Sequence, residues 1–253
     1  MAGLYKDEPF FPKFKAFMAG LFKKQGELLG WEKKEGENEN AGSMRAAIFV
    51  SLGKAGDEET LSKAAEMFEE YYNGGDAIDA DLRRVVYKFA LQADEAGVMR
   101  KLMDLYAKTT FPEEQRNLMI TLGEVKDPRL HAEVRDWALW SGAVRLQDIA
   151  YPLSTLGSSS QENSESAWRY FQDNHDRLKE RFGGEPRIWG SIAALLSRGG
   201  SNGSKRVSEI RAFFEARGGY GSAKRRVEQS CEALLLKEAR ISRDGAVLKT
   251  FKF

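Results

Sequence analysis

A short motif of a hydroxyl residue, leucine and glycine recurs along this 253-residue chain. The motif occurs as Ser51-Leu52-Gly53, Thr121-Leu122-Gly123 and Thr155-Leu156-Gly157, each time followed by polar residues and a new amphipathic pattern. The last two glycines are 34 residues apart and the first two are 70 apart, which is about twice 35. Periods of this length are typical of helix pairs that stack into a curved solenoid, because one pair cannot bury its own apolar face.

The stretch from Asn117 to Trp140 illustrates how one repeat is built. Asp127 followed by Pro128 marks a helix start, because aspartate caps a helix N-terminus and proline suits the first helical position. Apolar residues on either side of this start recur at spacings of three and four, which places them on one helix face. These residues are Leu118, Leu122 and Val125 before it, and Leu130, Val134 and Trp137 after it. The stretch therefore predicts two short helices joined at Asp127.

Comparable helical patterns extend from Phe10 to Ile241, and no useful alternation with a period of two appears between them. The sequence therefore predicts an all-α fold. We expect a right-handed superhelix of HEAT/armadillo-like helix pairs that spans residues 1–253 as a single domain.

Some helix boundaries can also be placed. A helix over Met44–Leu52 is expected to end at Gly53, and Asp79 or Asp81 is expected to begin a later helix. The segment Thr110–Glu113 fits a capping box with proline in the first turn.

The charge balance argues against a nucleic-acid partner. Lys and Arg number 39 against 38 Asp and Glu, so the net charge is +1, whereas nucleic-acid binders usually carry a basic excess or stripe. No membrane association is expected either, because no apolar run approaches the roughly 18 residues that span a bilayer. The first residues do not resemble a signal peptide, and we expect that the sequence begins within a longer protein.

Metal-binding and nucleophilic residues are scarce. The chain has two histidines, His131 and His175, and one cysteine, Cys231. An H-E-x-x-H site needs histidines four residues apart and a Cys/His cluster needs further cysteines, so neither zinc site can form from these residues. We expect a buried structural Cys231, a hydrogen-bonded packing role for His175 and partial exposure of His131. Carboxylates are abundant, but no catalytic dyad can be assigned.

Two polar features have ordinary structural explanations. Gly199 to Lys205 resembles a phosphate-binding loop only superficially, because no strand precedes it, and a linker between helices is expected. Lys205-Arg206 and Lys224-Arg225-Arg226 are small basic clusters with acidic neighbours, which favours solvated helix faces. The alternative is an anion site at a helix start.

An ordered set of short motifs, none of them specific alone, resembles a known family. The motifs are Leu29-Gly30-Trp31, Asp81-Leu82-Arg83-Arg84-Val85-Val86-Tyr87, Arg145-Leu146-Gln147-Asp148, Ala167-Trp168-Arg169-Tyr170 with Asn174, and Phe213-Phe214. In this order and spacing they resemble the C-terminal helical domain of aminopeptidase N-type zinc metallopeptidases, nearest to the puromycin-sensitive branch. The resemblance covers roughly residues 14–243. It departs from the family pattern at Val85, His175 and Ile241.

The resemblance implies a parent enzyme that removes N-terminal residues from peptides with zinc held by H-E-x-x-H and a distal glutamate. None of those motifs occurs here, so the N-terminal and catalytic zinc domains would lie outside this chain, and the chain alone would be non-catalytic with no cofactor. The implied domain is a bowl of HEAT-like helix pairs that covers the catalytic domain, encloses the peptide cavity and gates access to it. Its implied partners are that catalytic domain and peptide substrates, in the cytoplasm.

The inner helices of a solenoid line its concave face, and two of their starts carry polar motifs. We therefore expect substrate- or domain-interface residues among Asp81, Arg83, Arg84, Arg145, Gln147 and Asp148. An arginine there could bind a peptide carboxylate through a charge-assisted, bidentate contact. Helix caps and ion pairs between repeats are the competing explanation for the same residues. The aromatic residues Tyr87, Trp168 and Phe171 are expected in the core.

Two other functions compete with the lid domain. A free-standing helical-repeat adaptor would present an exposed apolar groove to a protein partner. An independent hydrolase using scattered carboxylates is less well supported, since no convergent set of residues can be named.

Overall fold

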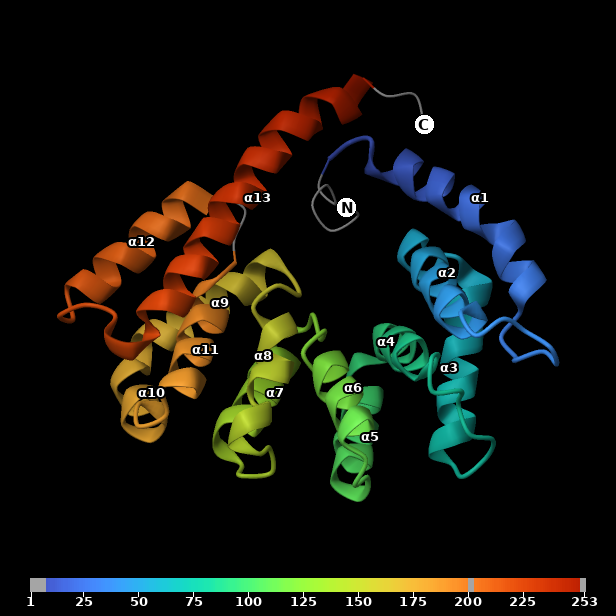
Figure 1. Ribbon diagram of the computed structural model, residues 1–253, viewed down its shortest axis with the longest axis horizontal. Helices are drawn as coiled ribbons and strands as arrows, with labels where there is room; N and C mark the ends of the chain where they lie inside the picture. The colour runs from blue at the N-terminus through green and yellow to red at the C-terminus, as the bar shows by residue number, and fades with distance from the viewer. Residues whose placement is uncertain (1–7, 200–202, 251–253) are drawn as a thin grey trace. The chain divides into compact units, whose positions relative to one another are not determined.

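The structure, a computed structural model, describes residues 8–199 and 203–250, and the regular secondary structure of this part is entirely helical (Figure 1). The predicted all-α class is therefore confirmed. The helices gather into two compact units: unit 1 comprises the residues up to Leu105 together with those from Arg243 onward, and unit 2 runs from Tyr106 to Ser242. The superhelical handedness, the bowl shape and the single domain stay predictions.

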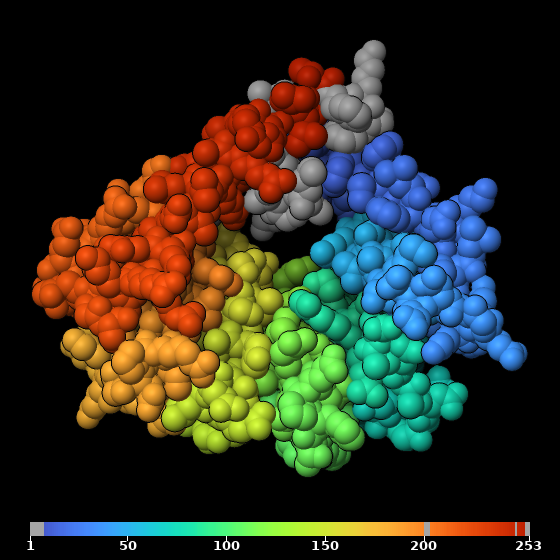
Figure 2. All heavy atoms as spheres, viewed as in Figure 1, coloured from blue at the N-terminus to red at the C-terminus, as the bar shows by residue number. Residues whose placement is uncertain are grey.

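Unit 1 contains α1 (Phe11–Leu29), α2 (Ala41–Ala55), α3 (Glu58–Tyr72) and α4 (Arg83–Ala93), and α5 (Glu95–Lys108) crosses into unit 2. Unit 2 continues with α6 (Pro112–Leu122), α7 (Pro128–Trp140), η2 (Leu146–Asp148), α8 (Ala150–Leu156), α9 (Gln161–Asp173), α10 (His175–Phe182), α11 (Pro186–Ser197), α12 (Gly203–Glu215), η3 (Gly221–Ala223) and most of α13 (Lys224–Thr250). In unit 2, α6 packs on α8, and α8 packs on α11. The side chains of successive helices in this unit abut one another (Figure 2).

The glycine of the repeated motif lies where one helix meets an equivalent helix further along the chain. A Cβ on Gly123, at the end of α6, would lie 2.2 Å from the carbonyl oxygen of Pro152 in α8. A Cβ on Gly157, at the end of α8, would lie 2.6 Å from the carbonyl oxygen of Leu195 in α11. Only glycine permits such close approach of two backbones. The repeated glycines thus lie at the contacts between successive helix pairs.

Gly53 shows the same principle with a different local role. Its helix, α2, was expected to end at this glycine, but it continues to Ala55 and ends at Gly56, whose φ of 89° is left-handed. A Cβ on Gly53 would lie 2.2 Å from the ring of Phe89 in α4. Gly53 therefore accommodates the neighbouring helix rather than terminating its own.

Replacing Gly123 by alanine should lower the free energy of unfolding by about 2 kcal/mol, because the added methyl group overlaps the α8 backbone, which cannot move as a side-chain tip can. Urea denaturation followed by circular dichroism measures the change. Gly184→Ala is the matched control, since a Cβ there would contact nothing within 4 Å. Equal denaturation midpoints for the two variants would contradict the close-packing explanation.

The start of α7 lies where the sequence predicts it, whereas the cap of α6 and the start of α4 differ from the prediction. Asp127 caps α7, where its carboxylate accepts a hydrogen bond from the Arg129 backbone N–H at 2.8 Å. This bond lowers the pKa of Asp127. Pro112 lies in the first turn of α6, as predicted, but the capping box at Thr110–Glu113 is wrong, because Phe111 is the N-cap and contributes no side-chain cap. Helix α4 likewise starts later than expected, at Arg83, since Asp79 closes a preceding turn instead.

The core of unit 2 centres on an aromatic cluster around Phe171, which has no exposed surface. Its ring lies 5.9 Å from that of Trp168 and 5.7 Å from that of His175, between ring centroids. The Nδ1 atom of His175 is 2.7 Å from the Asp176 carboxylate. The predicted core positions of Trp168 and Phe171 and the packing role of His175 are therefore confirmed. Tyr87 and Cys231 are buried as well, as predicted.

The predicted partial exposure of His131 is wrong, because its side chain is fully buried. Its Nε2 atom lies 3.1 Å from the carbonyl oxygen of Leu156, the last residue of α8. Carbonyl groups at a helix end have no partner within the helix, and this imidazole supplies one. Burial lowers the pKa of His131.

Arg206 also departs from the prediction of a solvated helix face. It is 3% exposed and forms ion pairs with Glu165 at 2.5 Å and Glu209 at 3.1 Å, with its guanidinium over the Trp168 ring. Its neighbour Lys205 is exposed, as expected. Of the predicted linker over Gly199–Lys205, residues 200–202 lie outside the described residues.

Candidate functional site

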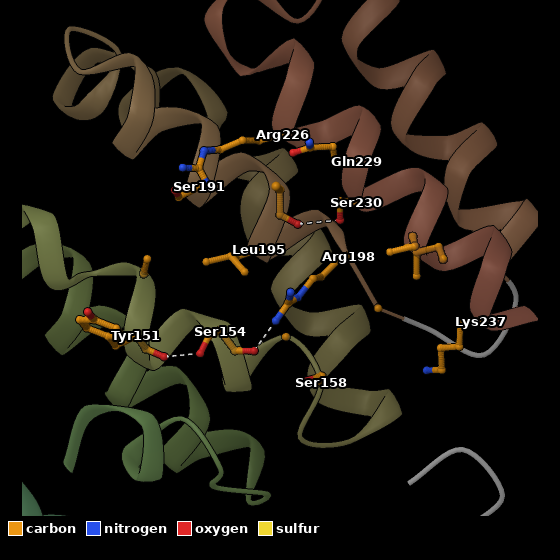
Figure 3. Close-up of a pocket in the computed structure, with 16 residues that line it drawn as sticks. Tyr151, Ser154, Ser158, Ser191, Leu195, Arg198, Arg226, Gln229, Ser230 and Lys237 are labelled. Carbon is orange, nitrogen blue, oxygen red and sulfur yellow. Dashed lines mark hydrogen bonds between the residues drawn. The ribbon is translucent and has the colours of Figure 1, made fainter. Parts of the chain in front are cut away.

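Two adjoining cavities lie in unit 2 between α8, α11 and α13, and Figure 3 shows the larger of them. The larger has a volume of about 610 Å³ and the smaller about 190 Å³. Four residues line both cavities: Ala150, Tyr151, Ser191 and Arg226. We call the combined surface the cationic groove, after the charged residues that line it. These are Arg187 in α11, Arg198 directly after α11, and Arg226 and Lys237 in α13.

The lining of the groove combines positive charge with small neutral groups. None of the described residues that line the two cavities carries a carboxylate. Hydroxyl and amide groups suited to hydrogen bonding with a peptide backbone come from Gln147, Tyr151, Ser154, Ser158, Ser191, Gln229 and Ser230. The apolar part of the surface is made by Leu146, Ile149, Ala150, Ile188, Ile192, Ala194, Leu195, Ala233 and Leu234. An apolar pocket with a few convergent polar groups is typical of ligand sites.

Local contacts position two of the groove arginines. Arg198 caps the C-terminal end of α11, is half-buried, and donates a hydrogen bond to the backbone carbonyl of Ser154 in α8 (Figure 3). Burial lowers the pKa of Arg198, but a guanidinium stays protonated in proteins. The stem of Arg226 packs over Gly190, where a Cβ would lie 3.0 Å from its Cδ atom. A glycine at that position thus leaves room for the arginine beside α11.

Among the described residues, the four groove cations have no carboxylate partner, unlike two other arginines of this protein. Arg45 is paired with Glu37 at 2.5 Å, and Arg145 with Asp148 at 2.7 Å. None of the four forms an ion pair with a carboxylate in residues 8–199 or 203–250. In a chain with a net charge of only +1, the groove is a local concentration of positive side chains. Such a cleft attracts anionic ligands.

The second predicted set of site residues falls partly within this groove. Gln147 lines the smaller cavity. Arg145 and Asp148 instead neutralise each other, and Arg145 also donates a hydrogen bond to the side chain of Gln115 in α6 at 3.0 Å. Burial, and then the charge of Asp148, raise the pKa of Tyr106. These contacts have the inter-helix character that the competing structural explanation describes, and a substrate role for the three residues stays a prediction.

The first predicted set lies in unit 1, at the turn before α4 and at its start. The carboxylate of Asp81 packs against the first turn of α2, where it would lie 1.9 Å from a Cβ on Gly42. Arg83 donates a hydrogen bond to the Ile78 carbonyl at 3.3 Å, and Arg84 is exposed. A negative charge at a helix N-terminus is stabilising, so Asp81 has a local structural role. A substrate- or domain-facing role for this set also stays a prediction.

The sequence did not single out the groove residues as a group. Arg226 belongs to the basic cluster Lys224-Arg225-Arg226, whose predicted exposure is confirmed, whereas Arg187, Arg198 and Lys237 belong to none of the sequence motifs. Their shared surface depends on α8, α11 and α13 packing together, and no local signal reports that packing.

Neither a metal centre nor a membrane span is found within the described part of the chain. No three His, Cys, Asp or Glu side chains converge there as metal ligands, so these residues do not fit the zinc of the implied parent enzyme. No helix in the described ranges is long and apolar enough to cross a membrane.

Comparison with known proteins agrees with the motifs quoted above. The chain is 25% identical to glutamyl aminopeptidase of Mus musculus over 229 residues, which are 90% of this chain and 24% of the relative. It is 28% identical to aminopeptidase M1 of Arabidopsis thaliana, covering 86% of this chain and 25% of the relative, and 24% identical to puromycin-sensitive aminopeptidase of Caenorhabditis elegans, covering 79% and 21%. The chain thus spans about a quarter of the length of these relatives. A family model described as the ERAP1-like C-terminal domain matches residues 1–236. The chain belongs to the ERAP1-like C-terminal domain family.

Proposed function

We propose that this chain is the C-terminal domain of a zinc-dependent aminopeptidase that removes N-terminal residues from peptides. In this proposal the domain is not catalytic alone. Together with the catalytic domain of the same protein it encloses the cavity that holds the distal part of a peptide, and it gates entry and release. The family match and the aminopeptidase names of the relatives support the proposal.

The observation that carries the peptide-binding role is the cationic groove. Its volume of about 610 Å³ in the larger cavity falls in the range that holds small ligands or a few residues of a chain. Arginines bind carboxylates through paired N–H groups, and the serine hydroxyls suit backbone amide and carbonyl groups. The groove can therefore bind a peptide segment through the negative charges and the backbone of the peptide. Its affinity for the peptide should depend only weakly on neutral peptide side chains.

The remaining parts of the proposal concern the rest of the enzyme. Zinc belongs to the catalytic domain, and no step of zinc chemistry is assigned to residues of this chain. We place the enzyme in the cytoplasm, a compartment compatible with the buried, unpaired thiol of Cys231.

The test is a titration of this chain into the catalytic part of a puromycin-sensitive aminopeptidase that lacks its own C-terminal domain. Hydrolysis of a fluorogenic aminoacyl substrate and of a ten-residue peptide is followed in parallel. We expect the chain alone to hydrolyse neither substrate, and mixing to change the processing of the peptide more than that of the small substrate. Hydrolysis by the chain alone would refute the proposal. If mixing changes the hydrolysis of neither substrate, the adaptor function is favoured instead. A pull-down would then identify the protein partner of the adaptor.

A further inference from the structure

We propose that the cationic groove selects peptides that carry two carboxylates about five residues apart. This inference rests on the proposed peptide-binding function and adds the chemical class of the peptide. It is carried by the spacing of the four groove cations on two neighbouring helices.

The cations have the same spacing on both helices. Arg187 lies in α11, and Arg198, 11 positions later, directly follows the last residue of that helix. Arg226 and Lys237 are 11 positions apart within α13. Eleven residues make about three turns of an α-helix, so the Cα atoms of each pair lie on about the same side and roughly 16 Å apart along the helix axis.

The cavities show which cations share an end of the groove. Arg187 and Arg226 both line the smaller cavity, whereas Arg198 and Lys237 line only the larger one. Figure 3 shows Arg226 and Lys237 at opposite ends of the larger pocket, with Ser230 between them. The groove therefore has two cations toward each end, and neutral residues of α11 and α13, among them Ala194, Leu195 and Ser230, line the space between them.

One carboxylate cannot reach both ends of such a surface. An extended peptide rises about 3.3 Å per residue, so about five residues span the roughly 16 Å between the two pairs. Two anionic groups at that separation would each face a cationic pair, and the residues between them would lie over the alanine and serine surface. Because the described lining residues include four cations and no carboxylate, the groove favours an acidic peptide over a basic one.

The carboxylates can come from two sources, aspartate or glutamate side chains or the C-terminus of the peptide. Both present the same planar pair of oxygens to an arginine. The experiment therefore includes peptides whose two negative charges are both side chains, and peptides in which one is the terminal carboxylate.

The test measures fluorescence anisotropy of labelled peptides of about ten residues on the 253-residue chain. The reference peptide is amidated at its C-terminus and has two glutamates five positions apart in a neutral alanine and serine background. Comparison peptides have two adjacent glutamates, one glutamate, two lysines, or one glutamate five positions before a free C-terminus. We expect the reference and the free-terminus peptide to bind roughly tenfold more tightly than the single-glutamate peptide, with the adjacent pair close to the single-glutamate value and the dilysine peptide weakest.

Matched variants locate the binding on the groove. Arg226→Gln and Lys237→Gln should each bring the affinity for the reference peptide close to that for one glutamate. Arg225→Gln, a neighbouring exposed arginine that does not line the groove, should leave the affinity unchanged. Added salt should weaken binding of the reference peptide most, because the contacts are ionic.

Equal affinity for five-position and adjacent glutamates, or an equal effect of Arg225→Gln, would overturn the spacing proposal. Tight binding only of free-terminus peptides would also overturn it, in favour of a simple terminal-carboxylate site. Altered processing of neutral peptides in the mixing assay, with no preference for acidic ones, would leave the proposed function standing while this inference fails.

Discussion

Replacing Arg45 by alanine is expected to destabilise unit 1 by about 3 kcal/mol, because this arginine is 2% exposed and holds together two helices and a loop. Its Nε atom donates to the carbonyl of Gly30 at 2.8 Å, and Nη2 donates to that of Leu29 at 3.4 Å, at the C-terminal end of α1. The same Nη2 atom donates to the Glu37 carboxylate at 2.5 Å. Alanine removes all three bonds and leaves a cavity.

Urea denaturation of the whole chain, followed by circular dichroism, provides the measurement for Arg45→Ala. Arg100→Ala is the control in the same unit, since Arg100 is exposed and a surface substitution usually changes stability by less than about 0.5 kcal/mol. Equal effects of the two substitutions would show that Arg45 does not stabilise this region.

The loss of stability caused by Arg45→Ala should depend on pH and should be smaller in acid. The hydrogen bond from Arg45 lowers the pKa of Glu37 below its ordinary value of 4.5. The stabilisation from this pair is therefore complete above pH 4.5 and is lost as the pH falls through the lowered pKa. The difference in stability between wild type and Arg45→Ala should shrink in acid. A difference that is constant down to low pH would contradict a contribution from the ion pair.

The second large effect is expected for Phe171→Ala, with a loss of roughly 4 kcal/mol in unit 2. Phe171 lies in α9, has no exposed surface and is surrounded by rings, including Trp189 with a centroid distance of 5.9 Å and Phe213 at 5.8 Å. Truncation removes a full aromatic ring from a close-packed site, and the neighbouring rings can fill the space only in part. Phe171→Leu keeps much of the volume and should cost less.

The same urea titration measures the Phe171 variants, with Phe111→Ala as the control in unit 2 because its side chain is 73% exposed. The cluster also bears on the candidate site, since Trp189 belongs to α11, which carries Arg187. We expect the folded Phe171→Leu variant to retain the groove, and thus to bind acidic peptides with wild-type affinity. A Phe171→Ala effect no larger than that of Phe111→Ala would contradict the central place of this ring in the core.

The placement of polar residues separates what could be predicted from what could not. Arg206 and Lys205 are adjacent in a basic cluster, yet one is buried among Glu165, Glu209 and Trp168 while the other is exposed. Arg206 is buried and paired because Glu165 and Trp168 belong to α9, which lies about 40 residues earlier in the chain. Hydrophobic periodicity does not indicate which polar side chain a distant helix will contact, so it does not predict the burial of Arg206.

The sequence by itself determined the all-helical class, the start of α7 at Asp127 and Pro128, the buried aromatic residues and the family, because each follows from local spacing or from the order of short motifs. It also contained the repeated glycines, whose meaning became clear only once Gly123 and Gly157 were seen against the backbones of the next helices. The tertiary structure alone decided the burial of His131 and the assembly of the cationic groove. The physical reason is that burial and charge compensation depend on contacts between helices far apart in the chain, whereas helix formation depends on neighbours within a few residues.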